Sequence, residues 1–256
     1  MEPVLVMQVF IYIFLVLFGL VIGSFLNVVI YRYPQGESLI SPPSSCVHCK
    51  TMLHTSDLVP VVSYLFLMGR CRYCGGSVSW RYPFVELLTA LLFLTCYIYF
   101  GLTPLFFEYL VISCILIVIS FIDLDKGIIP NRLVLLLLLW SIVWQLIHPI
   151  ITLAAAGTGL LAGGGLFYLI AVLSKGGMGG GDIKLMAVLG FALGWPLVLI
   201  VFLLAFLLGA AVGVILMLAG KKTRRDPLPF GPFIAISFLI SVFWGVQIWQ
   251  WYMIYI

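Results

Sequence analysis

Four of the six cysteines form two Cys-x-x-Cys pairs, Cys46 with Cys49 and Cys71 with Cys74. Four thiolates at this spacing are typical of a tetrahedral zinc site, because each pair makes a tight turn that places two sulfurs on one ion. Such a closed shell has no open position for substrate, so a zinc ion here would stabilise the fold and take no part in catalysis. The alternatives are a redox thiol pair, four cysteines that are merely small residues, or a mixed site in which His48 replaces one cysteine.

Carboxylates are few, with nine acidic residues in the chain. Four of them are candidates for chemistry: Glu86, Asp123, Asp125 and Asp182. Asp182 ends the glycine-rich stretch 176–181, whose backbone can approach a neighbour closely and present the carboxylate at the start of the next helix. If Asp123 and Asp182 meet, their like charges make them share a proton. One then acts as general base toward water and the other as general acid toward a peptide carbonyl.

The elements that hold these residues are apolar, since 64% of the chain is hydrophobic and only 9% is charged. This composition predicts a membrane protein and excludes a nucleic-acid binder, a disulfide-stapled secreted module and a disordered chain. About eight apolar runs are present, judged by the roughly 20 residues that a membrane-spanning helix needs. They are 4–30, 83–100, 105–122, 133–147, 150–173, 183–193, 197–219 and 230–256.

The basic residues predict how the runs cross the membrane. Run 183–193 is short, so a re-entrant segment is an alternative to a span. If every run crosses, all 13 Lys and Arg fall on one side, whereas a re-entrant 183–193 would move the basic cluster 221–225 to the outer face. The positive-inside rule therefore favours an all-α polytopic protein of about eight transmembrane helices, with both termini outside.

Three regions follow from this topology. Residues 1–31 form a first transmembrane helix, which is retained because no basic segment precedes it. Residues 32–82 form a cytoplasmic zinc-binding module between the first two helices. Residues 83–256 form a membrane domain of about seven helices. Asp123 and Asp182 both lie at the inner face of this domain, which is a necessary condition for them to meet.

Several motifs resemble the type IV prepilin peptidase family, which processes prepilins, pseudopilins and competence pilins. Besides the cysteine pairs, they are 23–32 (Gly-Ser-Phe-Leu-Asn-Val-Val-Ile-Tyr-Arg), 81–90 (Arg-Tyr-Pro-Phe-Val-Glu-Leu-Leu-Thr-Ala), 122–131 (Ile-Asp-Leu-Asp-Lys-Gly-Ile-Ile-Pro-Asn) and 179–184 (Gly-Gly-Gly-Asp-Ile-Lys). The resemblance covers nearly the whole chain, and their order on this helical frame is more specific than any single motif.

The resemblance implies a membrane aspartic endopeptidase of the bacterial inner membrane. It would remove the leader peptide from prepilins or pseudopilins at the cytoplasmic face, and residues 83–256 would be its peptidase domain. Asp123 and Asp182 would be the catalytic dyad, with Asp125 as the fallback for the first aspartate. The supporting residues would be Gly179, Gly181 and Lys184.

The resemblance also implies methylation of the new pilin N-terminus with S-adenosylmethionine, in which the first inner loop takes part. Glu86 and Arg81 are the candidates for binding the donor or the pilin amine, and a structural Arg-Glu pair is the alternative. The expected partners are a prepilin substrate and the lipid bilayer, without nucleic acid. The alternative function is a proton-coupled transporter with the two aspartates as relay groups, and a zinc-bearing scaffold without catalysis is a third.

Overall fold

The structure is a computed structural model that describes residues 3–175, 177–223 and 226–255. The sequence-based predictions for Gly176, Arg224 and Arg225 therefore lie outside the described residues. Within them the regular elements are helices, and strand-like pairing is limited to two isolated bridges. The helices are α1 (Pro3–Arg32), η1 (Tyr33–Gln35), η2 (Thr55–Asp57), α2 (Val62–Phe66), α3 (Arg81–Phe100), α4 (Pro104–Lys126), α5 (Asn131–Ile147), α6 (Leu153–Leu173), α7 (Gly180–Leu193), α8 (Leu197–Leu218) and α9 (Gly231–Ile254).

Six of the described helices are long and apolar enough to cross a membrane, namely α1, α3, α4, α6, α8 and α9. They confirm an all-helical membrane protein. The other two apolar helices are shorter, with 17 residues in α5 and 14 in α7. At 1.5 Å per residue, α7 is about 21 Å long, against a hydrocarbon core of about 30 Å. The count of eight spans stays a prediction.

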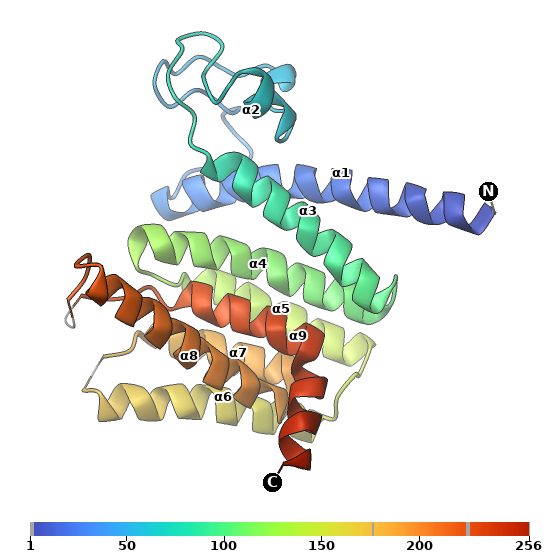
Figure 1. The fold of residues 1–256 in the computed structure, drawn as a ribbon, viewed down its shortest axis with the longest axis vertical. Helices are drawn as coiled ribbons and strands as arrows, with labels where there is room; N and C mark the ends of the chain where they lie inside the picture. The colour runs from blue at the N-terminus through green and yellow to red at the C-terminus, as the bar shows by residue number, and fades with distance from the viewer. Residues whose placement is uncertain (1–2, 176, 224–225, 256) are drawn as a thin grey trace. The chain divides into compact units, whose positions relative to one another are not determined.

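The chain forms two compact units, Met1–Leu110 and Val111–Ile256. In the first unit, α1 packs along α3. Figure 1 shows the connection between these two helices as a small module of loops that includes the short helix α2. The cysteine pairs lie in this module, each at one of the isolated bridges, Ser45 with Met52 and Arg70 with Ser77.

In the second unit, α7 packs against α6 and α5, and α8 packs against α9. The contact between α6 and α7 is a backbone contact at Gly159 and Gly190. A Cβ atom built on Gly190 would lie 2.1 Å from the carbonyl oxygen of Gly159, so neither helix has room for a side chain there. This packing fixes the helix that carries Asp182.

Candidate functional site

Asp123 lies in the last turns of α4, and its side chain is 5% exposed. The backbone N–H of Gly231 donates a hydrogen bond of 2.8 Å to its Oδ2 atom. Gly231 is the first residue of α9, so this bond ties the end of α4 to the beginning of the last helix. Sequence analysis missed Gly231, although the Gly-Pro pair at the start of an apolar run is typical of a helix beginning.

Asp182 lies in the first turn of α7. Its Oδ1 atom is buried and has no hydrogen-bond partner among the described residues. The start of α7 that carries Asp182 packs against the segment that follows Asp123, through Gly181 against Ile129 and Lys184 against Asn131. Asp125, the fallback for the first aspartate, is instead exposed on the last turn of α4.

The glycines before Asp182 differ in how much space surrounds them. A Cβ atom on Gly179 would lie 2.9 Å from the Asp182 Oδ2 atom, and one on Gly181 would lie 2.8 Å from the Cβ atom of Ile129. A Cβ atom on Gly180 would meet nothing within 4 Å. Glycine is therefore needed at the third position of the motif, whereas a side chain at the first position would have to displace the Asp182 carboxylate. At this third position, the absence of a side chain on Gly181 lets α7 pack against the loop that follows Asp123.

This difference predicts opposite effects at neighbouring glycines. If the site has the leader peptidase activity that the motifs imply, we expect Gly181→Ala to lower it about 100-fold, because a methyl group against Ile129 displaces Asp182, and a shift of about 1 Å has an effect of that size. Gly180→Ala is the matched control and should retain activity. Initial cleavage rates of a prepilin by the two purified variants measure the effect. Equal loss in both would contradict the packing argument.

Lys184 holds the same helix from its exposed side. Its Nζ atom donates a hydrogen bond of 3.0 Å to Oδ1 of Asn131, the first residue of α5. Asn131 belongs to the motif of Asp123 and Lys184 to the motif of Asp182. The bond therefore joins the two motifs at the helix starts, which suits Lys184 to a supporting role.

The four cysteines of the module come together. Their sulfur atoms all lie within 4.8 Å of one another, and the Cys46 and Cys74 sulfurs are 3.9 Å apart. Tetrahedral zinc with Zn–S bonds of about 2.3 Å separates its sulfurs by about 3.8 Å. A hydrogen bond between Cys49 and the Thr51 side chain lowers the pKa of Cys49 to about 6, which favours the thiolate that a metal requires. The arrangement suits a metal ion, and His48 lies outside the cluster.

Asp57 braces this module, a role that sequence analysis missed. Its carboxylate accepts hydrogen bonds from the Arg72 side chain at 2.7 Å, the Tyr73 hydroxyl at 3.0 Å and the His54 backbone N–H at 3.2 Å. Desolvation opposes ionisation, but these hydrogen bonds outweigh it and lower the pKa of Asp57. An acidic residue in a polar loop carries no sequence signal of this kind, because its partners lie about 15 residues further along the chain.

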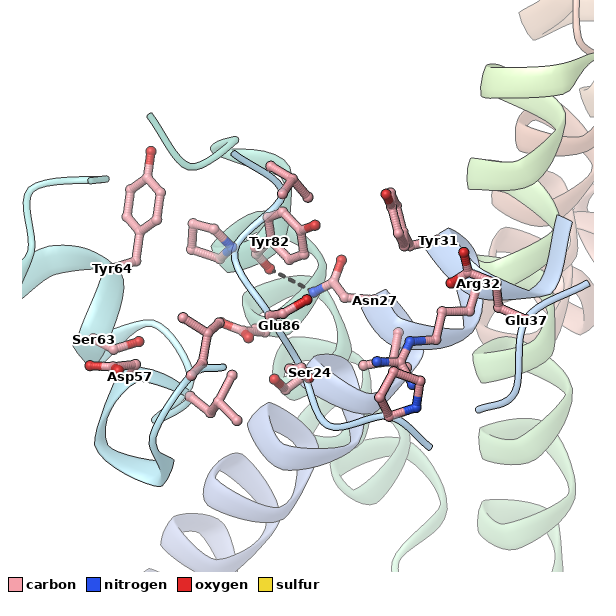
Figure 2. A pocket seen from close by; sticks show the side chains of 18 of the residues that line it. Ser24, Asn27, Tyr31, Arg32, Glu37, Asp57, Ser63, Tyr64, Tyr82 and Glu86 are labelled. Atoms are coloured by element: carbon pink, nitrogen blue, oxygen red, sulfur yellow. Dashed lines mark hydrogen bonds between the residues drawn. The ribbon is translucent and has the colours of Figure 1, made fainter. Parts of the chain in front are cut away.

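Of the two candidates for methylation, Glu86 lies on a pocket and Arg81 does not. Glu86 is 6% exposed and its Oε2 atom accepts a hydrogen bond of 2.8 Å from the Val61 backbone N–H. It lines a cavity of about 600 Å³ between the ends of α1 and α3 and the cysteine module (Figure 2). Arg81 is the first residue of α3 and is half-buried outside the cavity lining.

Two family models match the chain. The "Bacterial Peptidase A24 N-terminal domain" matches residues 17–100, and the "Type IV leader peptidase family" matches residues 110–214. A prepilin leader peptidase/N-methyltransferase of Bacillus subtilis is 38% identical over 238 residues, which are 93% of this chain and 96% of the relative. The chain belongs to the type IV leader peptidase family.

Other members of the type IV leader peptidase family are equally similar. Enzymes with the same name from Aeromonas hydrophila and Legionella pneumophila are each 38% identical, over 93% and 96% of this chain and 92% and 96% of the relatives. No solved structure matches the chain. Membership in this family confirms the resemblance found in the sequence and shows that the chain is an enzyme. The matched families and relatives give no support to a transporter.

Proposed function

We propose that this enzyme removes the leader peptide from type IV prepilins or pseudopilins by an aspartic mechanism. The observation that carries the proposal is the contact between the two aspartate motifs, in which Lys184 bonds Asn131 and Gly181 lies against Ile129. Its support is that Asp123 is held by the Gly231 N–H, while the buried Oδ1 atom of Asp182 has no partner among the described residues and is left to accept a proton or a hydrogen bond from substrate. The names of the relatives support the choice of substrate.

The proposed chemistry needs only the two carboxyl groups and water. One carboxylate takes a proton from a water molecule as its oxygen attacks the scissile carbonyl carbon, and the other carboxyl group gives its proton to the carbonyl oxygen. As the carbon–nitrogen bond breaks, the nitrogen receives a proton from the dyad and leaves as the new pilin N-terminus. A carboxyl pair shares one proton readily, because like charges at close range do not both ionise.

The proposed location is the cytoplasmic face of the inner membrane. Asp123 lies near the end of α4 and Asp182 at the beginning of α7, beside short loops that carry basic residues. A prepilin has an apolar helix in the bilayer and a polar leader in the cytosol, so its scissile bond lies at this boundary. In this topology α5 and α7 also cross, giving about eight spans with both termini outside.

Cleavage by the purified enzyme tests this function. The full-length protein in detergent is mixed with a prepilin, and leader loss is followed by gel electrophoresis. We expect the prepilin to shorten to its mature form. If well-folded protein cleaves none of several prepilins and pseudopilins, the peptidase proposal is wrong and a transport function of the aspartates regains weight.

We also propose a structural zinc ion on Cys46, Cys49, Cys71 and Cys74, in the functional region 32–82. This region would serve the second activity in the relatives' names, N-methylation of the new pilin N-terminus. S-adenosylmethionine is the expected donor. The residues present fit such a donor, because Glu86 provides a buried carboxylate on a cavity of suitable size.

Replacing Cys46 by serine tests the zinc ion and its role. We expect bound zinc to fall from about one ion per chain to near zero, because loss of one buried ligand opens a closed tetrahedral shell. Methyl transfer should fall with it, whereas leader cleavage should persist, since the dyad lies in the other compact unit. Metal content by mass spectrometry and both activities are measured. Cys114→Ser, in α4, is the matched control, and unchanged zinc in Cys46→Ser would refute the site.

A further inference from the structure

The cavity between α1, α3 and the cysteine module is large enough to hold a small molecule. Its volume of about 600 Å³ lies in the range of sites for drug-sized ligands and cofactors. Figure 2 shows polar and aromatic side chains from α1, α3 and the module around it. The sequence motifs 23–32 and 81–90 both contribute, through Asn27 and Glu86, which explains why these segments carry polar residues at helix ends.

Two polar side chains in the cavity lining are almost fully buried. Glu86 is 6% exposed and Asn27 is 5% exposed. Gly23 makes this burial possible, because a Cβ atom there would lie 2.6 Å from the Cα atom of Glu86, and α1 therefore approaches α3 closely. Asn27 is oriented by a hydrogen bond of 3.0 Å from its Nδ2 atom to the Tyr82 carbonyl oxygen. Buried polar groups are costly unless they have partners, and these partners fix both side chains in place on the cavity wall.

Glu86 keeps acceptor capacity for a ligand. Its carboxylate accepts the Val61 N–H and a hydrogen bond from Ser24. An ionised carboxylate has about four acceptor positions, so two such bonds leave others for a cationic group. A cation that enters the cavity therefore meets a negative charge that is already held in place by two elements of the protein.

The rest of the lining suits a ligand that carries both charges and a flat ring. Tyr31, Tyr64 and Tyr82 offer aromatic faces, which bind cations and stack on bases. Arg32 and Lys50 also line the cavity and offer positive charge to a carboxylate. A sulfonium nucleoside with an amino acid tail has all of these groups: a fixed cation, a carboxylate and a purine.

We propose that this cavity is the methyl-donor site, in which Glu86 faces the sulfonium of S-adenosylmethionine and Tyr31 provides an aromatic wall. The inference rests on the proposed methylation. When bound, such a donor supplies a methyl group to a neutral amine: a nitrogen–carbon bond forms, the carbon–sulfur bond breaks with its electron pair left on sulfur, and the excess proton of the amine goes to solvent.

The same cavity links the zinc module to the donor. Val47 and Lys50 lie in and directly after the first cysteine pair, and both line the cavity. A metal ion on the four cysteines therefore fixes one wall of the donor site without touching the donor. This position gives the module a role in methylation that a closed metal shell could not have by itself.

Calorimetry with two ligands tests the role of Glu86. The full-length enzyme in detergent is titrated with S-adenosylmethionine and with S-adenosylhomocysteine, a neutral thioether that keeps the amino acid tail and the purine. In wild type we expect the sulfonium to bind about tenfold more tightly, as for one charge-assisted contact. Glu86→Gln should remove this preference. If Glu86 had only a structural role, Glu86→Gln would weaken the binding of both ligands equally. That result would overturn the assignment of Glu86 to the sulfonium.

Two further variants complete the test. Glu108→Gln changes another buried carboxylate of the same unit, outside the cavity, and should keep the preference for the sulfonium. Tyr31→Ala changes a side chain that is 45% exposed and should weaken both ligands without unfolding the protein, so it decides the matter if Glu86→Gln does not fold. Tight binding to Tyr31→Ala would refute the cavity.

A parallel assay with labelled donor and a prepilin separates the two levels of the proposal. If wild type transfers methyl groups but Glu86→Gln and Tyr31→Ala bind the donor as wild type does, the methylation stands and its site lies elsewhere. If wild type neither binds the donor nor labels the pilin, the proposed methylation is wrong, and the proposed donor site is then wrong as well.

Discussion

Asp182→Asn is expected to abolish leader cleavage, and Asp123→Asn to do the same. An amide cannot exchange a proton with water or with the scissile carbonyl, so either change removes one half of the general acid–base pair. We expect the cleavage rate to fall by at least about 10³-fold, within the range that general acid–base groups contribute. The rate is measured with purified protein and a prepilin in detergent, together with the melting temperature of each variant.

Asp125→Asn is the matched control for these variants. Asp125 lies two residues after Asp123 in the same helix, but it is exposed, so its loss should change the rate little. If Asp125→Asn loses as much activity as Asp123→Asn, the first member of the dyad is assigned to the wrong residue. If both dyad variants cleave at the wild-type rate, the aspartic mechanism is excluded.

Gly190→Ala is expected to damage both stability and cleavage. The added Cβ atom would lie 2.1 Å from the Gly159 carbonyl oxygen, so α6 and α7 must separate. Overpacking of this kind costs about 1–3 kcal/mol or more. Because α7 carries Asp182 in its first turn, the shift also misplaces the dyad. We expect a lower melting temperature and a cleavage rate reduced about 100-fold.

Gly165→Ala provides the comparison within α6. A Cβ atom there meets nothing within 4 Å, and alanine favours a helix over glycine by about 1 kcal/mol. This variant should be at least as stable as wild type and fully active. A stable and active Gly190→Ala would show that the two helices tolerate a wider separation than their backbone contact indicates.

The membrane class and the cysteine cluster could be predicted from the sequence because their signals are local. Long apolar runs predict helices, and six of them are helices of sufficient length and hydropathy. Each cysteine pair is a single turn, and only the meeting of the two pairs needs the fold. The glycine-rich stretch before Asp182 could also be recognised in the sequence, but the different amounts of space around its glycines could not.

The partners of the candidate site could not be predicted, because they come from remote segments. The bond between Gly231 and Asp123 joins residues 108 positions apart, and the bond between Val61 and Glu86 joins a loop to a helix. No periodicity encodes such contacts. The sequence pattern also does not decide whether α7 crosses the membrane, because a helix of 14 residues is shorter than the thickness of the hydrocarbon core.

The hydrogen bond from Gly231 to Asp123 has a consequence for biosynthesis. The ribosome makes α4 long before it makes α9, so a nascent chain that has inserted α4 and α7 already contains both aspartates but lacks the N–H that orients the first. The Asp123 side chain reaches its final hydrogen bonding only after the last helix has left the translocon. If the proposed dyad is correct, a chain that ends before α9 should therefore cleave a prepilin more slowly than the chain that contains α9.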